Sequence, residues 1–273
     1  MNQEQRLDFL LEKLIGESDV HIAARPQTLE EKRDLLRALM NVRPPRPIDD
    51  AVLEVQDEYL RERAVEKGVV SLAGIPVIAD RGSDCEFGDA ISIWQGDITR
   101  LSCDAIVNAA NSQMLGCFTP LHSCIDNFIH TYAGIQLRLE CNRRMNELRA
   151  IHGEEYEQPT AVPMLTEAYN LPSRKVVHIV GPIVHPMLSE EHERQLRDCY
   201  TRTLDLCTGE DLRSVAFCCI STGVFRFPPR RASEIAIEAV TWWLGNHPDQ
   251  VDRVIFNVFK DEDRILYERA LCK

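Results

Sequence analysis

Short runs rich in Val and Ile alternate with helical stretches from about residue 75 onward, and this alternation constrains the fold most. Candidate strands cover 91-94, 105-108, 160-165, 176-180, 215-220 and 254-259. Helical patterns lie between or after them, near 123-148, 190-207, 231-245 and 261-271. Strand–helix alternation of this kind is typical of a mostly parallel sheet with helices on both faces. The sequence therefore predicts an α/β fold for this part of the chain.

Residues 1-75 have a different pattern, without Cys or Trp. Thr28 followed by Glu31 is a capping box at the start of a helix. A further helix is predicted from Asp49 or Asp50 to Gly68. An earlier amphipathic stripe follows helical spacing at Leu7, Leu10, Leu11 and Leu14. We therefore divide the chain into an N-terminal helical extension, 1-75, and a main domain, 76-273, against which the three helices pack.

The charge balance argues against two classes of partner. Lys and Arg number 31 against 43 Asp and Glu, which gives a formal net charge of -12. Proteins that bind duplex nucleic acid or anionic membranes usually present a basic surface. We therefore expect neither a nucleic-acid nor a membrane partner.

The N-terminal residues and the cysteines point to one compartment. The chain starts without the basic and apolar regions of a signal peptide, so we expect none. Ten cysteines in such a chain are expected to be reduced thiols, some buried and some available to metal. A cytoplasmic location follows as the default expectation.

Three short motifs follow predicted strands. They are Gly96-Asp97-Ile98-Thr99, the segment 104-111 (DAIVNAAN) and the segment 220-225 (ISTGVF). In open α/β sheets, ligands bind beyond the carboxyl ends of the strands, so the three motifs can converge on one crevice. Each has a simpler explanation. Asp97 could cap a turn, Asn108 and Asn111 could be turn residues, and Gly223 could serve loop geometry alone. A P-loop, a dinucleotide G-x-G-x-x-G motif and a G-x-S-x-G elbow are all missing from the sequence.

Taken in order with Val180-Gly181-Pro182, these motifs resemble those of the macrodomain family over roughly residues 88-270. The resemblance implies a three-layer α/β/α macrodomain with a mixed, mostly parallel sheet, preceded here by a small helical extension. Macrodomains bind ADP-ribose, and many hydrolyse it from modified proteins. The same chemistry is therefore expected of this chain.

The resemblance also implies roles for individual residues. Asp97 would bind the adenine amino group, with Ile98 beside it. Asn108 and Asn111 would lie near the distal ribose, against which Phe225 would pack. The diphosphate would be wrapped by the backbone N–H groups of Ser221, Thr222, Gly223 and Val224. A loop of N–H groups can hold a diphosphate without Lys or Arg, so the acidic charge does not exclude an anionic ligand.

The segment after Asn111 departs from the family pattern. Ordinary macrodomains carry a run of glycines there, of which only Gly116 remains. Cys117, His122 and Cys124 stand in its place, spaced C-x4-H-x-C. Two thiolates and one imidazole are good ligands for Zn2+, and three protein ligands leave the open position typical of catalytic zinc.

This loop resembles that of the zinc-dependent macrodomain subclass of microbes, which also has an N-terminal helical extension. That resemblance implies one Zn2+ per chain. Two alternatives remain at this stage. The cysteines could be small buried thiols, or Asp126 or another Cys could close a structural zinc site.

The leading hypothesis is a zinc-dependent hydrolase that removes mono-ADP-ribose from protein side chains. Asn111 and Asp126 are the candidate catalytic residues, and the metal ligands are Cys117, His122 and Cys124. The expected partners are an ADP-ribosylated protein as substrate and ADP-ribose as product, with the enzyme a monomer. The sequence leaves open whether attack falls on the anomeric carbon or on an acyl carbonyl. Two alternatives remain, a non-catalytic ADP-ribose reader and a hydrolase of small O-acyl-ADP-ribose esters.

Overall fold

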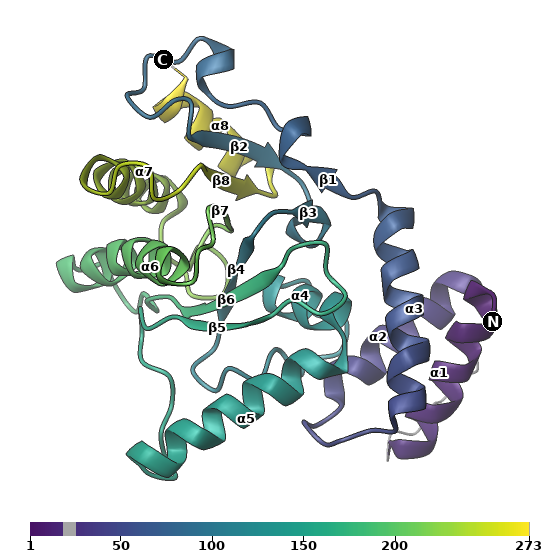
Figure 1. The fold of residues 1–273 in the computed structure, drawn as a ribbon. Helices are drawn as coiled ribbons and strands as arrows, with labels where there is room; N and C mark the ends of the chain where they lie inside the picture. The colour runs from purple at the N-terminus through teal and green to yellow at the C-terminus, as the bar shows by residue number, and fades with distance from the viewer. Residues whose placement is uncertain (19–25, 273) are drawn as a thin grey trace. The chain divides into compact units, whose positions relative to one another are not determined.

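The computed structural model describes residues 1–18 and 26–272, and the chain divides into two compact units (Figure 1). The first, here called the helical unit, consists of Met1–Gly68, Gln113–Tyr156 and Ala168–Leu171. The second, here called the sheet unit, consists of Val69–Ser112, Glu157–Glu167 and Pro172–Lys273. The predicted division into an N-terminal extension, 1-75, and a main domain, 76-273, remains a prediction.

The N-terminal helices form as their sequence patterns predict. In α2, the Thr28 side chain accepts a hydrogen bond from the Glu31 N–H, and the Glu31 carboxylate accepts one from the Thr28 N–H, which completes the capping box. Helix α3 ends at Gly68, whose φ of 81° is readily adopted only by glycine. The bounds of the helices are α1 Gln3–Glu17, α2 Leu29–Val42, α3 Asp50–Lys67, α4 Ile125–Ala133 and α5 Ile135–His152.

The core of the helical unit joins the N-terminal helices to α5. Its members are apolar side chains with 7% or less of their surface exposed, so they exclude water from the helix contacts. They are Leu7, Leu10, Leu11, Leu14, Leu36, Leu39, Met40, Val52, Tyr59, Leu60 and Ile135. The extension therefore packs against a helix from later in the chain, as the sequence analysis expected.

The region predicted to be helical near 123-148 contains two helices, because the chain breaks at Gly134 between α4 and α5. Gly134 has a φ of 102°, and a side chain there would place its Cβ 2.7 Å from Gln56 Nε2. Gln56, in α3, also accepts a hydrogen bond of 3.0 Å at its Oε1 from the Ile135 N–H. A contact between distant segments thus ends one helix and begins the next.

The sheet unit contains a six-stranded sheet within the described residues, in the order β2-β8-β7-β4-β6-β5. All neighbours are parallel except β5, which runs antiparallel to β6. The predicted α/β fold with a mixed, mostly parallel sheet is confirmed. A separate parallel pair consists of β1 and β3. The strands are β1 Val70–Ser71, β2 Ile91–Gln95, β3 Leu101–Ser102, β4 Ala105–Ala110, β5 Met164–Glu167, β6 Lys175–Val180, β7 Ser214–Phe217 and β8 Arg253–Val258.

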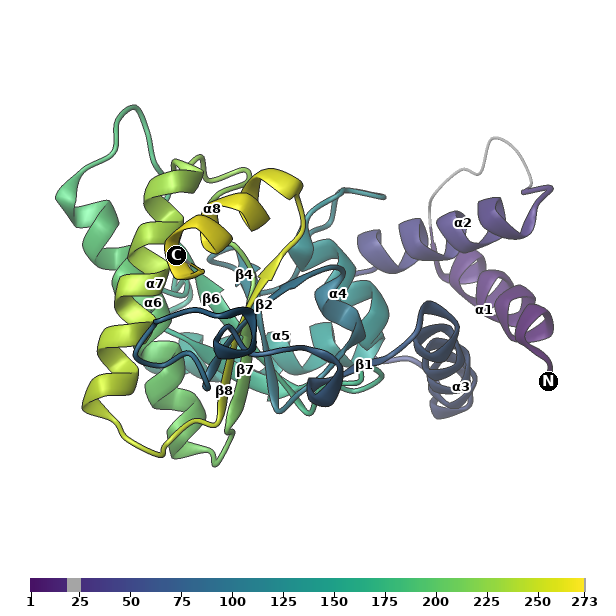
Figure 2. The ribbon, with the colours of Figure 1, turned by 90° about the horizontal axis from the view of Figure 1, so that it is seen from above.

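The α-helices of the sheet unit, within the described residues, are α6 Glu190–Gly209, α7 Pro229–Asn246 and α8 Asp261–Leu271. The steps from β6 to β7 and from β7 to β8 run in the same direction across the sheet. Because such crossovers are right-handed, α6 and α7 lie on the same face, where Figure 2 shows them side by side. Parallel strands bring their carboxyl ends to one edge, which is where the sequence motifs lie.

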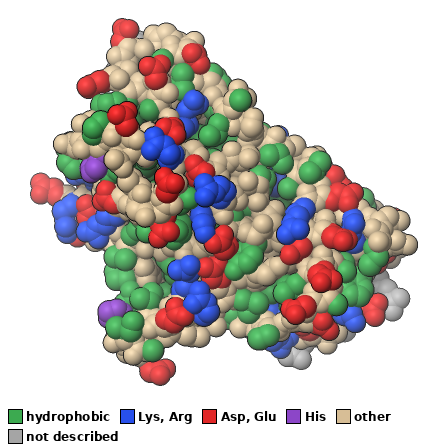
Figure 3. All heavy atoms as spheres, viewed as in Figure 1, with side chains coloured by type: hydrophobic (Ala, Val, Ile, Leu, Met, Phe, Trp, Pro, Cys, Tyr) green, Lys and Arg blue, Asp and Glu red, His purple; other side chains and the backbone are tan. Residues whose placement is uncertain are grey.

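The surface is mixed in charge on the face drawn in Figure 3, where acidic and basic side chains are interspersed. Among the described residues, no helix combines the length and the apolar character that crossing a membrane requires.

Candidate functional site

Asp97 follows strand β2 and begins the short 3-10 helix Ile98–Arg100. Its Oδ1 accepts hydrogen bonds from the Thr99 N–H at 3.0 Å and from Thr99 Oγ1 at 2.6 Å. Ile98 is completely buried. Asp97 therefore caps this short helix, which is the simpler role expected from the sequence. It is compatible with ligand binding, because a carboxylate has about four acceptor positions.

Asn108 and Asn111 differ in their surroundings. Asn108 lies within β4, is completely buried, and its Nδ2 is 3.1 Å from His178 Nδ1 on the neighbouring strand β6. Thr166 Oγ1 lies 3.0 Å from the other nitrogen of His178. This polar chain crosses the sheet interior. Asn111 follows the end of β4 and is half-buried, so of the two asparagines it is the more accessible to a ligand.

The segment after β7 forms a loop closed by its own backbone. The Phe227 N–H donates to the Ser221 carbonyl at 3.0 Å, and the Arg226 N–H donates to the Gly223 carbonyl at 3.0 Å. Ser221 has a φ of 64°, which costs a residue other than glycine about 1–2 kcal/mol. Its Oγ is buried and has no hydrogen-bond partner among the described residues. Strain and an unpaired buried hydroxyl in one residue are typical of a ligand-binding loop.

The same loop presents unused donors. Within the described part of the chain, the backbone N–H groups of Gly223, Val224 and Phe225 donate to no protein acceptor. Gly223 and Val224 are exposed, and helix α7 begins shortly afterwards at Pro229. Consecutive N–H groups before a helix N-terminus form a site suited to phosphate.

Gly181, at the end of β6, packs against this loop. A methyl group at Gly181 would overlap Ser221 Oγ and would lie 2.7 Å from Ile220 Cγ2. The Val184 N–H donates to the Phe225 carbonyl at 2.9 Å, which ties the segment after β6 to the other end of the loop. Glycine is needed at this position because the two backbone segments pack closely, which its sequence motif alone does not indicate.

The predicted metal ligands lie together in the helical unit. The ligand atoms of Cys117, His122 and Cys124 are all within 4.8 Å of one another, and all three residues are half-buried. Cys117 Sγ is 3.5 Å from His122 Nδ1. Asp126 is not a member of this cluster, and its Oδ1 lies 3.5 Å from His130 Nε2. Among the described residues, the cluster therefore offers three protein ligands.

Cys124 has two structural features that matter for metal binding. It is the N-cap of α4, where its sulfur accepts a hydrogen bond of 3.4 Å from the Asn127 N–H. Burial raises the pKa of the Cys124 thiol to about 12, although the Asn127 N–H acts in the opposite direction. Without a cation the thiol is protonated at neutral pH and is a weak nucleophile.

These residues fit a Zn2+ ion by their chemistry. Two thiols and an imidazole within 4.8 Å make a soft donor set of the kind that zinc prefers. A half-buried cluster with an N–H donor at one sulfur can stabilise two thiolates once a cation is bound.

Comparisons with known proteins agree with these features. The Macro domain family profile matches residues 107–236. The protein named protein-ADP-ribose hydrolase of Treponema medium is 43% identical over 99% of this chain and all of its own length. The chain belongs to the macrodomain family.

Two further relatives extend the likeness of this macrodomain. The protein-ADP-ribose hydrolase of Staphylococcus aureus strain Mu50 is 39% identical, covering 99% of this chain and 96% of its own. The crystal structure of a Trypanosoma brucei macrodomain in complex with ADP-ribose has a TM-score of 0.63. That structure is 27% identical and covers 90% of this chain and 97% of its own.

Proposed function

We propose that this macrodomain is a zinc-dependent hydrolase that removes mono-ADP-ribose from modified protein side chains. The likeness over nearly the whole chain to two proteins named protein-ADP-ribose hydrolase carries the proposal. The sulfur–imidazole cluster supports its metal-dependent part. We expect a cytoplasmic monomer that releases ADP-ribose and binds neither nucleic acid nor membrane.

In the sheet unit, this chain's residues bind the nucleotide. The carboxylate of Asp97 accepts a hydrogen bond from the adenine amino group, beside the apolar surface of Ile98. The N–H groups of Gly223, Val224 and Phe225 donate to the diphosphate, as their lack of protein acceptors favours. The hydroxyl of Ser221 has no internal partner and donates to the same ligand.

Catalytic and positioning roles are proposed for three residues. Asn111 orients a ribose hydroxyl or the attacking water through its side-chain amide. Phe225 packs against the sugar and excludes solvent, which strengthens polar interactions at the reacting bond. Asp126 is buried with its Oδ1 3.5 Å from His130 Nε2, and its carboxylate acts as a proton acceptor.

Cys117, His122 and Cys124 would hold the metal. When bound, Zn2+ supplies Lewis acidity, which polarises an ester or ribose oxygen and acidifies water. The two thiols act as ligands and need not attack the substrate.

The experiment measures ADP-ribose release from a mono-ADP-ribosylated protein by Cys117→Ala, His122→Ala and Asn111→Ala. We expect each variant to lose more than about a hundredfold in turnover, since each removes a ligand or a positioning group. Calorimetry with ADP-ribose is the control for an intact nucleotide site. Activity of the two ligand variants within about tenfold of wild type would remove zinc from the reaction.

The same assay separates the alternative functions. Tight ADP-ribose binding with intact substrate after long incubation would make the chain a reader. Release of ADP-ribose from a small O-acyl-ADP-ribose ester, but not from a modified protein, would identify the small ester as the substrate.

A further inference from the structure

The segment 117-124, here called the metal loop, carries the three predicted ligands. Two of its adjacent backbone groups form hydrogen bonds with side chains of helix α2, which lies about 80 residues earlier in the chain. Asn41 Oδ1 accepts a hydrogen bond of 3.1 Å from the Leu121 N–H. Arg37 Nη2 donates one of 2.7 Å to the His122 carbonyl. Because Arg37 and Asn41 are four residues apart, they lie on one face of α2. This face therefore fixes the backbone that carries the imidazole.

Arg37 is itself held in place by Asn127. Its Nε and Nη2 lie 3.1 Å and 2.7 Å from Asn127 Oδ1, and its guanidinium stacks 4.0 Å from the centre of the Phe128 ring. Asn127 is completely buried, and its Nδ2 donates to the Thr119 carbonyl at 3.0 Å. Its backbone N–H donates to Cys124 Sγ at 3.4 Å. One arginine is thus linked to both an imidazole-bearing and a sulfur-bearing residue.

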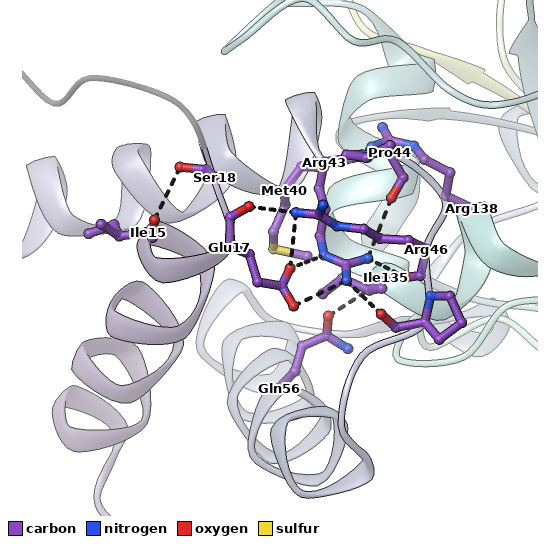
Figure 4. A network of polar contacts seen from close by, with 11 residues as sticks. Ile15, Glu17, Ser18, Met40, Arg43, Pro44, Arg46, Gln56, Ile135 and Arg138 are labelled. Atoms are coloured by element: carbon purple, nitrogen blue, oxygen red, sulfur yellow. Dashed lines mark hydrogen bonds and ion pairs between the residues drawn. The ribbon is translucent and has the colours of Figure 1, made fainter.

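The C-terminal end of α2 is anchored as firmly as the loop. Arg138 Nη1 donates to the carbonyls of Met40, Asn41 and Arg43 at 2.9, 2.9 and 2.6 Å. Its Nε donates to the Leu115 carbonyl at 2.7 Å, just before the metal loop. A buried cation is well placed at the negative end of a helix. Figure 4 shows Arg138 there, with Arg43 bonded to Glu17 at the end of α1.

We propose that Arg37 and Asn41 are positioning residues that hold the segment 117-124 in its ligand-presenting shape, so that the helical extension is part of the metal site. The proposal rests on the proposed function for its metal, but the hydrogen bonds that carry it need no metal. Without them, the three ligand atoms would have to be gathered from a mobile loop on each binding event, which lowers affinity.

The test compares Arg37→Ala, Asn41→Ala and Arg37→Lys with the control Arg33→Ala. Arg33 lies one turn earlier on α2 and pairs with Glu66 of α3, so it does not bond the loop. Zinc affinity is measured by competition with a chromophoric chelator. Hydrogen exchange of peptides covering 117-124 is measured on metal-free protein, and thermal melting checks that each variant is folded.

We expect Arg37→Ala and Asn41→Ala to lower zinc affinity about 10–100-fold, the usual effect of removing a group that orients metal ligands. Arg37→Lys keeps the charge and one donor, so its loss should be intermediate. Exchange in the loop should rise about tenfold or more in the two alanine variants. Arg33→Ala should stay within about twofold of wild type in both measurements.

Zinc affinities of both alanine variants within about threefold of wild type, with unchanged loop exchange, would overturn the proposal. If wild-type protein binds no zinc, the proposed metal function fails. The exchange measurement alone then decides whether Arg37 and Asn41 position the loop. Faster loop exchange then supports the positioning role, and unchanged exchange refutes it. If an alanine variant is unfolded at the assay temperature, Arg37→Lys replaces it in this comparison.

Discussion

Replacing Ser221 should make the ligand-free protein more stable while weakening ADP-ribose binding. Ser221 has a φ of 64°, and its buried Oγ lacks a partner among the described residues. Leaving a buried hydroxyl unpaired costs about 1–3 kcal/mol, so Ser221→Ala should raise the free energy of unfolding by about 1 kcal/mol. Ser221→Gly also relieves the backbone strain of about 1–2 kcal/mol, offset by about 0.5–1 kcal/mol of glycine entropy. Its total gain should be about 1–2 kcal/mol.

Thermal melting without ligand measures the gain in stability. A gain of about 1 kcal/mol corresponds to a rise in melting temperature of about 2–4 °C in a chain of this size. Calorimetry measures the loss of ADP-ribose affinity. One lost hydrogen bond of about 1.4 kcal/mol predicts about tenfold weaker binding. Thr203→Val is the matched control, since Thr203 Oγ1 in α6 is also buried without a partner among the described residues. It should gain similar stability and keep its affinity. Destabilised Ser221 variants with unchanged ADP-ribose binding would refute the reasoning.

Three other predictions concern stability and metal. Hydrogen bonds from Ser214, Arg174 and Arg213 outweigh the effect of burial and hold the pKa of Asp104 below its usual value. Asp104→Asn should therefore lose about 1–2 kcal/mol at pH 7, a difference that shrinks as pH falls below about 4 in pH-dependent melts. Gly116→Ala should lose more stability than Gly82→Ala in denaturant titrations, by about 1–3 kcal/mol. Both glycines have positive φ, but only at Gly116 would the new Cβ clash, 2.7 Å from His130 Cγ. Removing zinc with a chelator should lower the melting temperature, and readdition of zinc should restore it.

Features set by neighbouring residues were predictable from the sequence. The Leu7 and Leu11 stripe predicts α1, and the pairing of Thr28 with Glu31 predicts the start of α2. The runs at 91-94 and 176-180 predict β2 and β6 within one residue. The spacing of Cys117, His122 and Cys124 likewise favours a cluster, because the three residues lie within a segment of eight.

Features set by distant residues could not be predicted in this way. The break between α4 and α5 at Gly134 is bonded by Gln56, in α3, whose Oε1 accepts a hydrogen bond from the Ile135 N–H. The strand predicted at 160-165 lies at Met164–Glu167, where it pairs antiparallel with β6. Arg37 and Asn41 carry no local signal of a role at the metal loop, since each is an ordinary polar residue on an amphipathic helix.

The helical unit is discontinuous in sequence, which has a consequence for synthesis on the ribosome. Its last segment, Ala168–Leu171, follows its first helix by some 150 residues, and Asn170 Nδ2 donates to Asp57 Oδ1 of α3 at 2.7 Å. A nascent chain that has exposed only α1 to α3 still lacks the partners that complete their core. Cotranslational folding of this unit must therefore wait until the sheet unit's first two segments, Val69–Ser112 and Glu157–Glu167, have also emerged. A deletion that ends at residue 75 removes part of a shared core rather than a detachable appendage.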